Sequence, residues 1–235
     1  MIQKNLMEGF KQCFALFYPN LCLACGQSSP PKKEIICLSC QNKLPKTFFH
    51  LDKDNPFAER FWGRLPIWAA GALYHFSRGG RTQQLIHHLK YHNKPDIGRQ
   101  LGQYYGQELA QSDLFRPIDI IVPVPLHPRK KHQRGYNQSD AFAQGLSVGL
   151  GKPWLKDGLG RRAFTHTQTQ KSRQERMENV MTAFEIKKPK QLAHRHILLV
   201  DDVITTGATL EACGLQLLAL EGTHLSLATI GFAGY

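Results

Sequence analysis

The sequence lacks several features that would assign it to a class at once. No stretch of its 235 residues approaches the roughly 18 apolar residues that span a membrane. Residues 1–20 lack the long apolar core and the small-residue cleavage site of a secretory signal. There is no internal repeat and no low-complexity tract. These absences argue against a membrane-spanning or exported chain, and we expect a cytoplasmic protein.

Acidic residues are also scarce, with 18 Asp and Glu against 30 Lys and Arg, which gives a formal net charge of +12. This excess favours an acidic partner: nucleic acid, an anionic membrane surface or a polyphosphate ligand. Apolar residues make up 42% of the chain, so a hydrophobic core can form. The length suits one domain of good size and a smaller module.

The chain divides into four zones. Residues 1–18 have apolar side chains at helical spacing, which predicts a short amphipathic helix that packs on the protein or docks on a membrane. Residues 19–44 are turn-rich and hold paired cysteines, and residues 45–67 form a connector whose aromatic side chains indicate that it packs on something. Residues 68–235 alternate between strand and helix patterns.

The alternating zone predicts a mainly parallel sheet with helices on both faces. Ser139 or Asp140 is expected to cap the third of its helices, and Gly222 to end the fourth. The expected strands are 67–76, 118–126, 196–200 and 224–233, and the expected helices are 79–93, 97–112, 139–151 and 208–222.

The paired cysteines follow a C-x2-C, eleven-residue, C-x2-C spacing: Cys22, Cys25, Cys37 and Cys40. Each pair can close a tight turn that points two thiolates at one ion, and four thiolates satisfy tetrahedral Zn²⁺ as a structural site. The alternatives are two disulfides or a redox pair, but without an export signal or a thioredoxin-like context we favour zinc. The module serves either as scaffold or as a nucleic-acid contact.

The stretch 197-ILLVDDVITTGATL-210 carries the most chemistry. Its apolar start predicts a central parallel strand, whose carboxyl end is where open α/β sheets bind ligands. Asp201 and Asp202 alternate sides, so one can accept hydrogen bonds from vicinal hydroxyls while the other addresses a metal or a neighbouring loop. The small, hydroxyl-rich 205-TTGAT-209 opens a helix, as an anion site does. A plain capped turn is the alternative, but together the two halves favour a ribose 5-phosphate group.

This stretch resembles the signature of type I phosphoribosyltransferases, which bind phosphoribosyl pyrophosphate (PRPP). With the four-cysteine ribbon, nearly the whole chain resembles the competence-associated ComF family, to which GntX-type proteins are similar. The resemblance implies an α/β phosphoribosyltransferase fold, a small N-terminal zinc ribbon, a hood region, and Mg²⁺ bound with PRPP. It also implies that Asp201 and Asp202 hold the ribose hydroxyls and that the following residues hold the 5-phosphate: Val203, Ile204, Thr205, Thr206, Gly207, Ala208 and Thr209.

Two basic segments fit that resemblance. The loop 127-HPRKKHQRGYNQS-139 carries four cations, and the resemblance makes Arg134, Gly135, Tyr136 and Asn137 pyrophosphate ligands. A solvated loop is the alternative. Residues 161–186 match the family's flexible hood, which closes over the site. The alternative is that they form an ordinary exposed hairpin. Its candidate cations are Lys171, Arg173 and Arg176, with Arg162 and Gln168 as weaker candidates.

A helix before the pyrophosphate loop adds Lys90, which faces the site or lies on the surface. His87, His88 and His92 on the same helix are solvated or bind a metal, and the first is the commoner outcome.

Two functions remain. In the first, the protein is an enzyme in which a nitrogen nucleophile displaces pyrophosphate at C1 of PRPP, with Asp201, Asp202, Arg134, Lys171 and Arg173 as catalytic residues. In the second, it is a non-catalytic competence protein that binds single-stranded DNA and uses the site as a nucleotide or phosphate sensor. The family resemblance links both to DNA uptake in natural transformation and to other competence proteins as partners.

Overall fold

The computed structural model describes residues 21–32, 34–91, 93–161 and 183–234. The chain forms two compact units that divide between Leu44 and Pro45. No helix among these residues combines the length and the apolar character needed to cross a membrane.

A four-stranded parallel sheet is the centre of the second unit, in the order β1-β6-β5-β2. The strands are β1 (Ala69–Phe76), β2 (Ile120–Pro123), β5 (His196–Ile204) and β6 (His224–Ala233). The apolar run Ile197–Val200 is fully buried in β5, as expected for a central strand with helices on both faces. The predicted parallel α/β fold is therefore confirmed.

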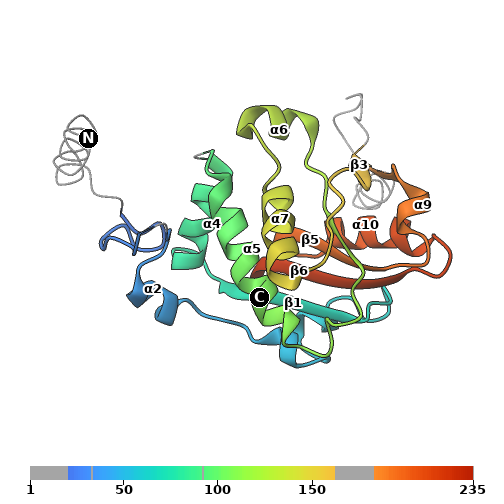
Figure 1. Ribbon diagram of the computed structural model, residues 1–235, viewed down its shortest axis with the longest axis horizontal. Coiled ribbons are helices and arrows are strands. Elements are labelled where there is room, and N and C mark those ends of the chain that lie inside the picture. The colour runs from blue at the N-terminus through green and yellow to red at the C-terminus, as the bar shows by residue number, and fades with distance from the viewer. Residues whose placement is uncertain (1–20, 33, 92, 162–182, 235) are drawn as a thin grey trace, which may run out of the picture. The chain divides into compact units, whose positions relative to one another are not determined.

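Helices cover this sheet (Figure 1). On one face, α10 (Ala208–Leu218) and the short α3 (Pro56–Glu59) share a hydrophobic core with the strands. Helices α4 (Arg81–Tyr91), α5 (Pro95–Ala110) and α7 (Gln138–Leu150) pack with one another and against β1, β2 and β5. The smaller elements of this unit are η1 (Phe49–Leu51), α6 (Pro128–Arg134), α9 (Pro189–Leu192) and the antiparallel pair β3 (Leu159–Arg161) and β4 (Phe184–Ile186).

Helices α5 and α7 lie side by side at backbone contact (Figure 1). A Cβ atom added to Gly102 would lie 2.3 Å from the carbonyl oxygen of Phe142, and one added to Gly145 would lie 2.1 Å from that of Arg99. Both separations are far below van der Waals contact, so only glycine allows the two helices to pack this closely.

Three local predictions were wrong. Asn137, not Ser139 or Asp140, caps α7, because its side-chain oxygen accepts the Ser139 N–H and its own backbone is extended. Helix α10 ends at Leu218, and Gly222, with φ +64°, lies in the turn before β6. The predicted loop after β2 contains helix α6, because Pro128 takes the first helical position and the His127 ring accepts the Arg129 N–H.

The residues predicted to be a connector belong to the core of the second unit. Phe57 and Phe61 are fully buried, and Asn55 caps α3. The backbone of Thr47 donates to Leu73 and that of His75 to Pro45, so the start of the segment lies along the edge strand β1. The expected N-terminal helix over 1–18 lies outside the described residues.

The first unit consists, in its described part, of turns and helix α2 (Leu38–Lys43). The Gly26 N–H donates to the Cys22 carbonyl, and Gly26 has φ +69°, as expected for the turn after the first cysteine pair. Cys37 caps α2, and Cys40 lies within it.

Candidate functional site

Strand β5 extends further than its apolar run predicts. It continues through Asp201 and Asp202 to Ile204, because Asp201 and Val203 keep their register opposite Thr229 and Gly231 of β6. The two carboxylates therefore project from a hydrogen-bonded strand rather than from the loop that follows. Such a backbone fixes their directions more tightly than a loop does.

The turn after β5 encloses a small pocket lined by Asp201 and the continuous run Val203–Leu210. Its volume is about 40 Å³, room for roughly three water molecules at 10–15 Å³ each. Gly207 has φ +83° and caps α10, and the Thr206 hydroxyl accepts the Ala208 N–H at 3.4 Å. The first N–H groups of a helix have no acceptor within it and carry partial positive charge. The pocket thus has the size and the donors for one phosphate group.

Asp201 is held by two donors on a single oxygen. The Ser139 hydroxyl lies 2.9 Å from its Oδ1 and the Asp202 N–H lies 2.8 Å from the same atom. Burial, followed by the neighbouring charge of Asp202, raises the pKa of Asp201 to about 7. This carboxyl therefore changes protonation near neutral pH, and its Oδ1 is fixed by the fold.

Asp202 pairs with a different element. Its Oδ2 lies 3.1 Å from the Nζ of Lys90 near the end of α4. Lys90 therefore faces the site. The two adjacent carboxylates contact different partners, as their alternation along the strand predicts.

The basic segment after β2 adopts a defined structure. Helix α6 has no buried residue, Gly135 closes it with φ +78°, and the guanidinium of Arg134 lies 2.9 Å from Gln138 Oε1 and 5.6 Å from the centre of the Tyr91 ring. The Tyr136 hydroxyl donates to the Leu89 carbonyl, and burial raises its pKa to about 12.

Asn137 joins α7 to the end of β2. Its Nδ2 donates to the Val124 carbonyl at 3.0 Å and to Asp140 Oδ1 at 2.8 Å. Burial raises the pKa of Asp140 to about 6. Asn137 and Tyr136 thus hold the backbone of this segment beside α4 and β2.

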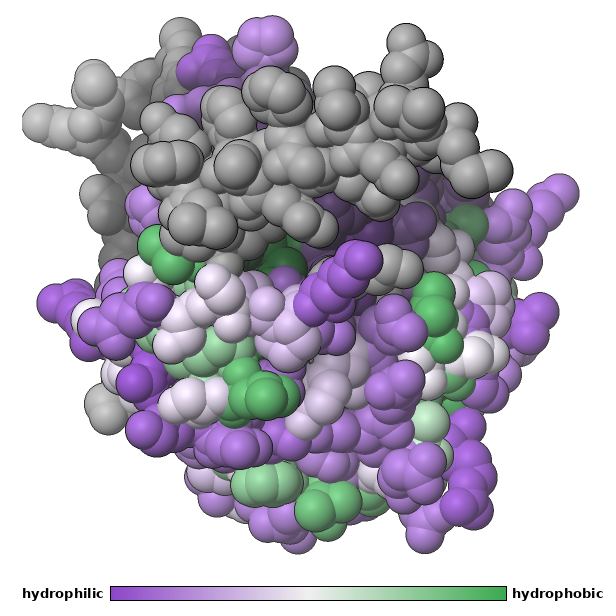
Figure 2. Space-filling view, turned by 60° about the vertical axis from the view of Figure 1, so that its left-hand side comes forward, coloured by the Kyte–Doolittle hydropathy of each residue, from purple (hydrophilic) through white to green (hydrophobic). Residues whose placement is uncertain are grey.

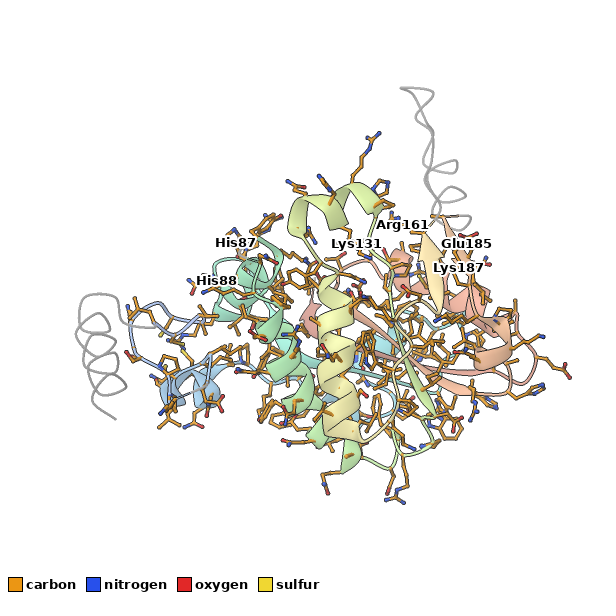
Figure 3. All side chains as sticks on the ribbon, turned by 45° about the horizontal axis from the view of Figure 1, so that its top comes forward. His87, His88, Lys131, Arg161, Glu185 and Lys187 are labelled. Atoms are coloured by element: carbon orange, nitrogen blue, oxygen red, sulfur yellow. The ribbon has the colours of Figure 1, made fainter. Side chains whose placement is uncertain are left out.

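The candidate hood residues Lys171, Arg173 and Arg176, with Arg162 and Gln168, lie outside the described residues. Strands β3 and β4 flank that segment and pair with each other. Arg161, Glu185 and Lys187 gather on this pair, while Lys131 lies on α6 (Figure 3). His87 and His88 lie on α4 (Figure 3). The centre of the His87 ring lies 4.8 Å from that of the Tyr91 ring, and the two ring planes are tilted by 42°.

The four cysteines meet in the first unit. The sulfur atoms of Cys22, Cys25, Cys37 and Cys40 all lie within 4.8 Å of one another, and no described cysteine forms a disulfide. Ligands 2.3 Å from a tetrahedral zinc ion stand about 3.8 Å apart, so small side-chain rotations would complete the set. Backbone N–H groups of Gln27 and Ser28 lower the pKa of Cys25 to about 6, which favours the thiolate. These residues fit a zinc ion, and they are the one such group of three or more potential ligands in the described chain.

Sequence reasoning missed several residues at the site. Ser139, expected only as a helix cap, contacts Asp201. Arg60, Phe61 and Arg64 of the supposed connector contact the segment 205–211, which comprises the turn after β5 and the first residues of α10. The only available signal was the density of aromatic residues in that segment.

The chain is similar to proteins with known names. It is 32% identical over 217 residues to the DNA utilization protein YhgH of Escherichia coli K12, covering 88% of each chain. It is 36% identical over 205 residues to Competence protein F of Haemophilus influenzae, covering 83% of this chain and 89% of that one. No protein-family model matches the chain.

Among solved structures, the glutamine PRPP amidotransferase of Bacillus subtilis aligns with a TM-score of 0.41 at 20% identity. That alignment covers 60% of this chain and 30% of the amidotransferase chain. The adenine phosphoribosyltransferase of Leishmania tarentolae aligns with a TM-score of 0.38 at 12% identity, over 80% and 94% of the two chains. These scores are too low to support a functional inference, whereas the relatives in sequence span most of both chains. The chain therefore belongs to the ComF family, together with Competence protein F and the DNA utilization protein YhgH.

Proposed function

We propose that this protein binds PRPP, or a related ribose 5-phosphate ligand, at the carboxyl end of β5. The observation that carries this proposal is the pocket that Asp201 shares with Val203–Leu210, because it joins a carboxylate to a phosphate-sized turn. The 5-phosphate occupies that turn, which offers backbone N–H groups, the hydroxyls of Thr205, Thr206 and Thr209, and the N-terminus of α10.

The ribose hydroxyls bind the two carboxylates. Ser139 and the Asp202 amide donate to Oδ1 of Asp201, and no other residue in the described part of the chain donates to its Oδ2, so that oxygen can accept from a hydroxyl. Asp202 exchanges its contact with Lys90 for a second hydroxyl. Lys90 is then available to the pyrophosphate, with Arg134, Gly135, Tyr136 and Asn137 as the further candidates.

The chemistry that we propose is displacement at C1 of PRPP. The C1–O bond to pyrophosphate breaks with its electron pair on the leaving oxygen, a nitrogen nucleophile forms the new C1–N bond, and the nucleophile releases its proton to water. Mg²⁺ bound to ligand oxygens would neutralise charge on the pyrophosphate. The protein contributes position and electrostatics, with Lys171, Arg173 and Arg176 of the candidate hood adding cations to the leaving group.

The names of the relatives support a role in DNA uptake or use during natural transformation. A second candidate is a non-catalytic protein that binds single-stranded DNA and reads the site as a nucleotide or phosphate sensor. The net charge of +12 and the basic helix α6, which has no buried residue, favour it. On the face shown in Figure 2, hydrophilic residues predominate and hydrophobic ones form small separate patches.

We also propose that the four cysteines hold one structural Zn²⁺. All four ligand positions would come from the protein, so no position would be open for substrate or water. The ion would stabilise a unit whose described part contains only a few buried residues besides the cysteines.

The two candidates are separated by three measurements on the full chain. PRPP with Mg²⁺ should raise the melting temperature, and the change should disappear when Asp201 and Asp202 are both replaced by Asn. Release of pyrophosphate in the presence of nitrogen nucleophiles would support the enzyme, whereas PRPP binding without release would support the sensor. An affinity for single-stranded DNA that falls steeply with added salt would support the DNA role, and an affinity independent of salt would contradict it.

A further inference from the structure

Residues 55–65 form a support beneath the phosphate turn, although the sequence presents them as part of a connector. Asn55 caps α3 through two N–H groups and is itself 1% exposed. The turns that follow α3 are closed by hydrogen bonds from the N–H groups of Arg64 and Leu65 to the Phe61 carbonyl. The segment is therefore anchored in the core of its unit and can hold other residues in place.

Three side chains of this support contact the turn in succession. The guanidinium of Arg60 donates to the carbonyls of Thr205 and Ala233 and lies 4.2 Å from the centre of the Phe232 ring.

The ring of Phe61 lies under Gly207, where an added Cβ would come within 2.9 Å of its Cζ. Arg64 forms a two-pronged ion pair with Glu211 in the first turn of α10. The beginning, middle and end of the segment 205–211 are thus each fixed by one residue of the support.

We propose that Arg60 is a positioning residue for the phosphate site. This inference rests on the proposed function and adds a residue to it. In a trans peptide the C=O and N–H groups point in opposite directions. Arg60 holds the Thr205 carbonyl on its own side, so the N–H of Thr206 in the same peptide points away from Arg60, toward the pocket that both threonines line. The guanidinium also polarises that peptide and makes its N–H a stronger donor.

The charge of the pocket explains why a bound phosphate needs a cation nearby. Among the described residues, those that line the pocket include Asp201 and no cation, and Asp202 lies next to Asp201. A phosphate dianion bound there meets repulsion from these carboxylates, which a helix N-terminus with about half a unit charge only partly offsets. Arg60 brings a full positive charge to the far side of the Thr205–Thr206 peptide.

The test measures ribose 5-phosphate binding by calorimetry and the Thr206 amide signal by nuclear magnetic resonance of ¹⁵N-labelled full-length protein. We expect Arg60→Gln to weaken binding about tenfold, the usual effect of losing one charge-assisted contact. The downfield shift that the ligand causes at the Thr206 amide should be smaller in Arg60→Gln than in the wild type. Arg60→Lys keeps the charge but cannot contact both carbonyls. Its affinity for ribose 5-phosphate should lie between those of the wild type and Arg60→Gln. Arg116→Gln removes a charge from a side chain that is 76% exposed and should bind like the wild type.

The outcomes separate the two proposals. If the wild type binds neither ribose 5-phosphate nor PRPP, the proposed function fails. If the wild type binds and Arg60→Gln binds equally well, or keeps the full Thr206 shift, the role of Arg60 is refuted while the function stands. If Arg60→Gln does not fold, the same criteria apply to Arg60→Lys, with an expected loss of about threefold.

Discussion

Replacing Asp201 with Asn should stabilise the protein while removing its ligand binding. The fold holds this carboxyl where ionisation is costly, because burial and the charge of Asp202 raise its pKa from 3.8 to about 7. Asn keeps an oxygen that can accept from Ser139 and the Asp202 amide, so the local hydrogen bonds survive. The substitution thus removes mainly the cost of the charge.

The magnitude follows from the difference between a pKa of 3.8 and one of about 7, which at 1.36 kcal/mol per pKa unit sets a ceiling of about 4 kcal/mol on the stabilisation. Because the folded-state pKa lies above the unfolded-state pKa, the folded protein binds this proton more tightly. Its contribution to stability is complete below about pH 3.8 and is lost as the pH rises through about 7. Between pH 5 and pH 8 the wild type should lose about 2–3 kcal/mol of its free energy of unfolding through this group.

The assay is urea unfolding followed by tryptophan fluorescence at pH 5 and pH 8. All three tryptophans, Trp62, Trp68 and Trp154, lie in the second unit, so the signal reports that unit alone. The free energy of unfolding of Asp201→Asn should exceed that of the wild type, and this difference should grow by about 2–3 kcal/mol from pH 5 to pH 8. Asp113→Asn, at a side chain that is 83% exposed, is the control and should show no growth. An advantage that stays constant or shrinks as the pH rises would refute the reasoning.

Three further predictions concern other parts of the chain. Protein purified without chelator should contain one zinc per chain by elemental analysis, and Cys25→Ser should lose it without changing tryptophan fluorescence; an absence of metal in the wild type contradicts the site. Gly102→Ala should lower the free energy of unfolding by about 1–3 kcal/mol, even though alanine favours helices, because its Cβ would clash with α7. The control Gln103→Ala, at an exposed position, should change that free energy little. Equal stabilities of the two variants would refute the close helix contact. Ser139→Ala removes a donor to Asp201, so the pKa of that carboxyl should rise further. PRPP affinity should then fall at pH 7 and below, and the loss should vanish at a pH well above the raised pKa; an unchanged pH profile of binding would argue against it.

Much of the fold follows from patterns that are local in the sequence. The apolar run Ile197–Val200 identifies a central strand because only a strand with helices on both faces buries every residue. The spacing of the four cysteines predicts their clustering, because each pair closes its own turn. Val203–Thr209 are consecutive, and Asp201 lies two positions before them. The lining of the pocket after β5 is therefore also visible in the sequence.

The rest depends on contacts between distant segments. Arg60 and Thr205 are 145 positions apart, so nothing in the sequence joins them. Ser139 reaches Asp201, 62 positions away, only because β2 and β5 are neighbours and α7 begins beside them. The end of β5 was misplaced because a strand continues as long as its neighbour pairs with it, and the pairing of Val203 with Gly231 is invisible to a pattern of apolar residues.

Calorimetric titration of the full chain with PRPP and Mg²⁺ tests the central claim most directly. We predict that the wild type binds one PRPP per chain, that Asp201→Asn combined with Asp202→Asn abolishes the binding, and that Asp113→Asn leaves it unchanged. Wild-type protein that gives no heat of binding with PRPP or ribose 5-phosphate, or a double variant that binds as tightly as the wild type, would contradict the assignment of this site.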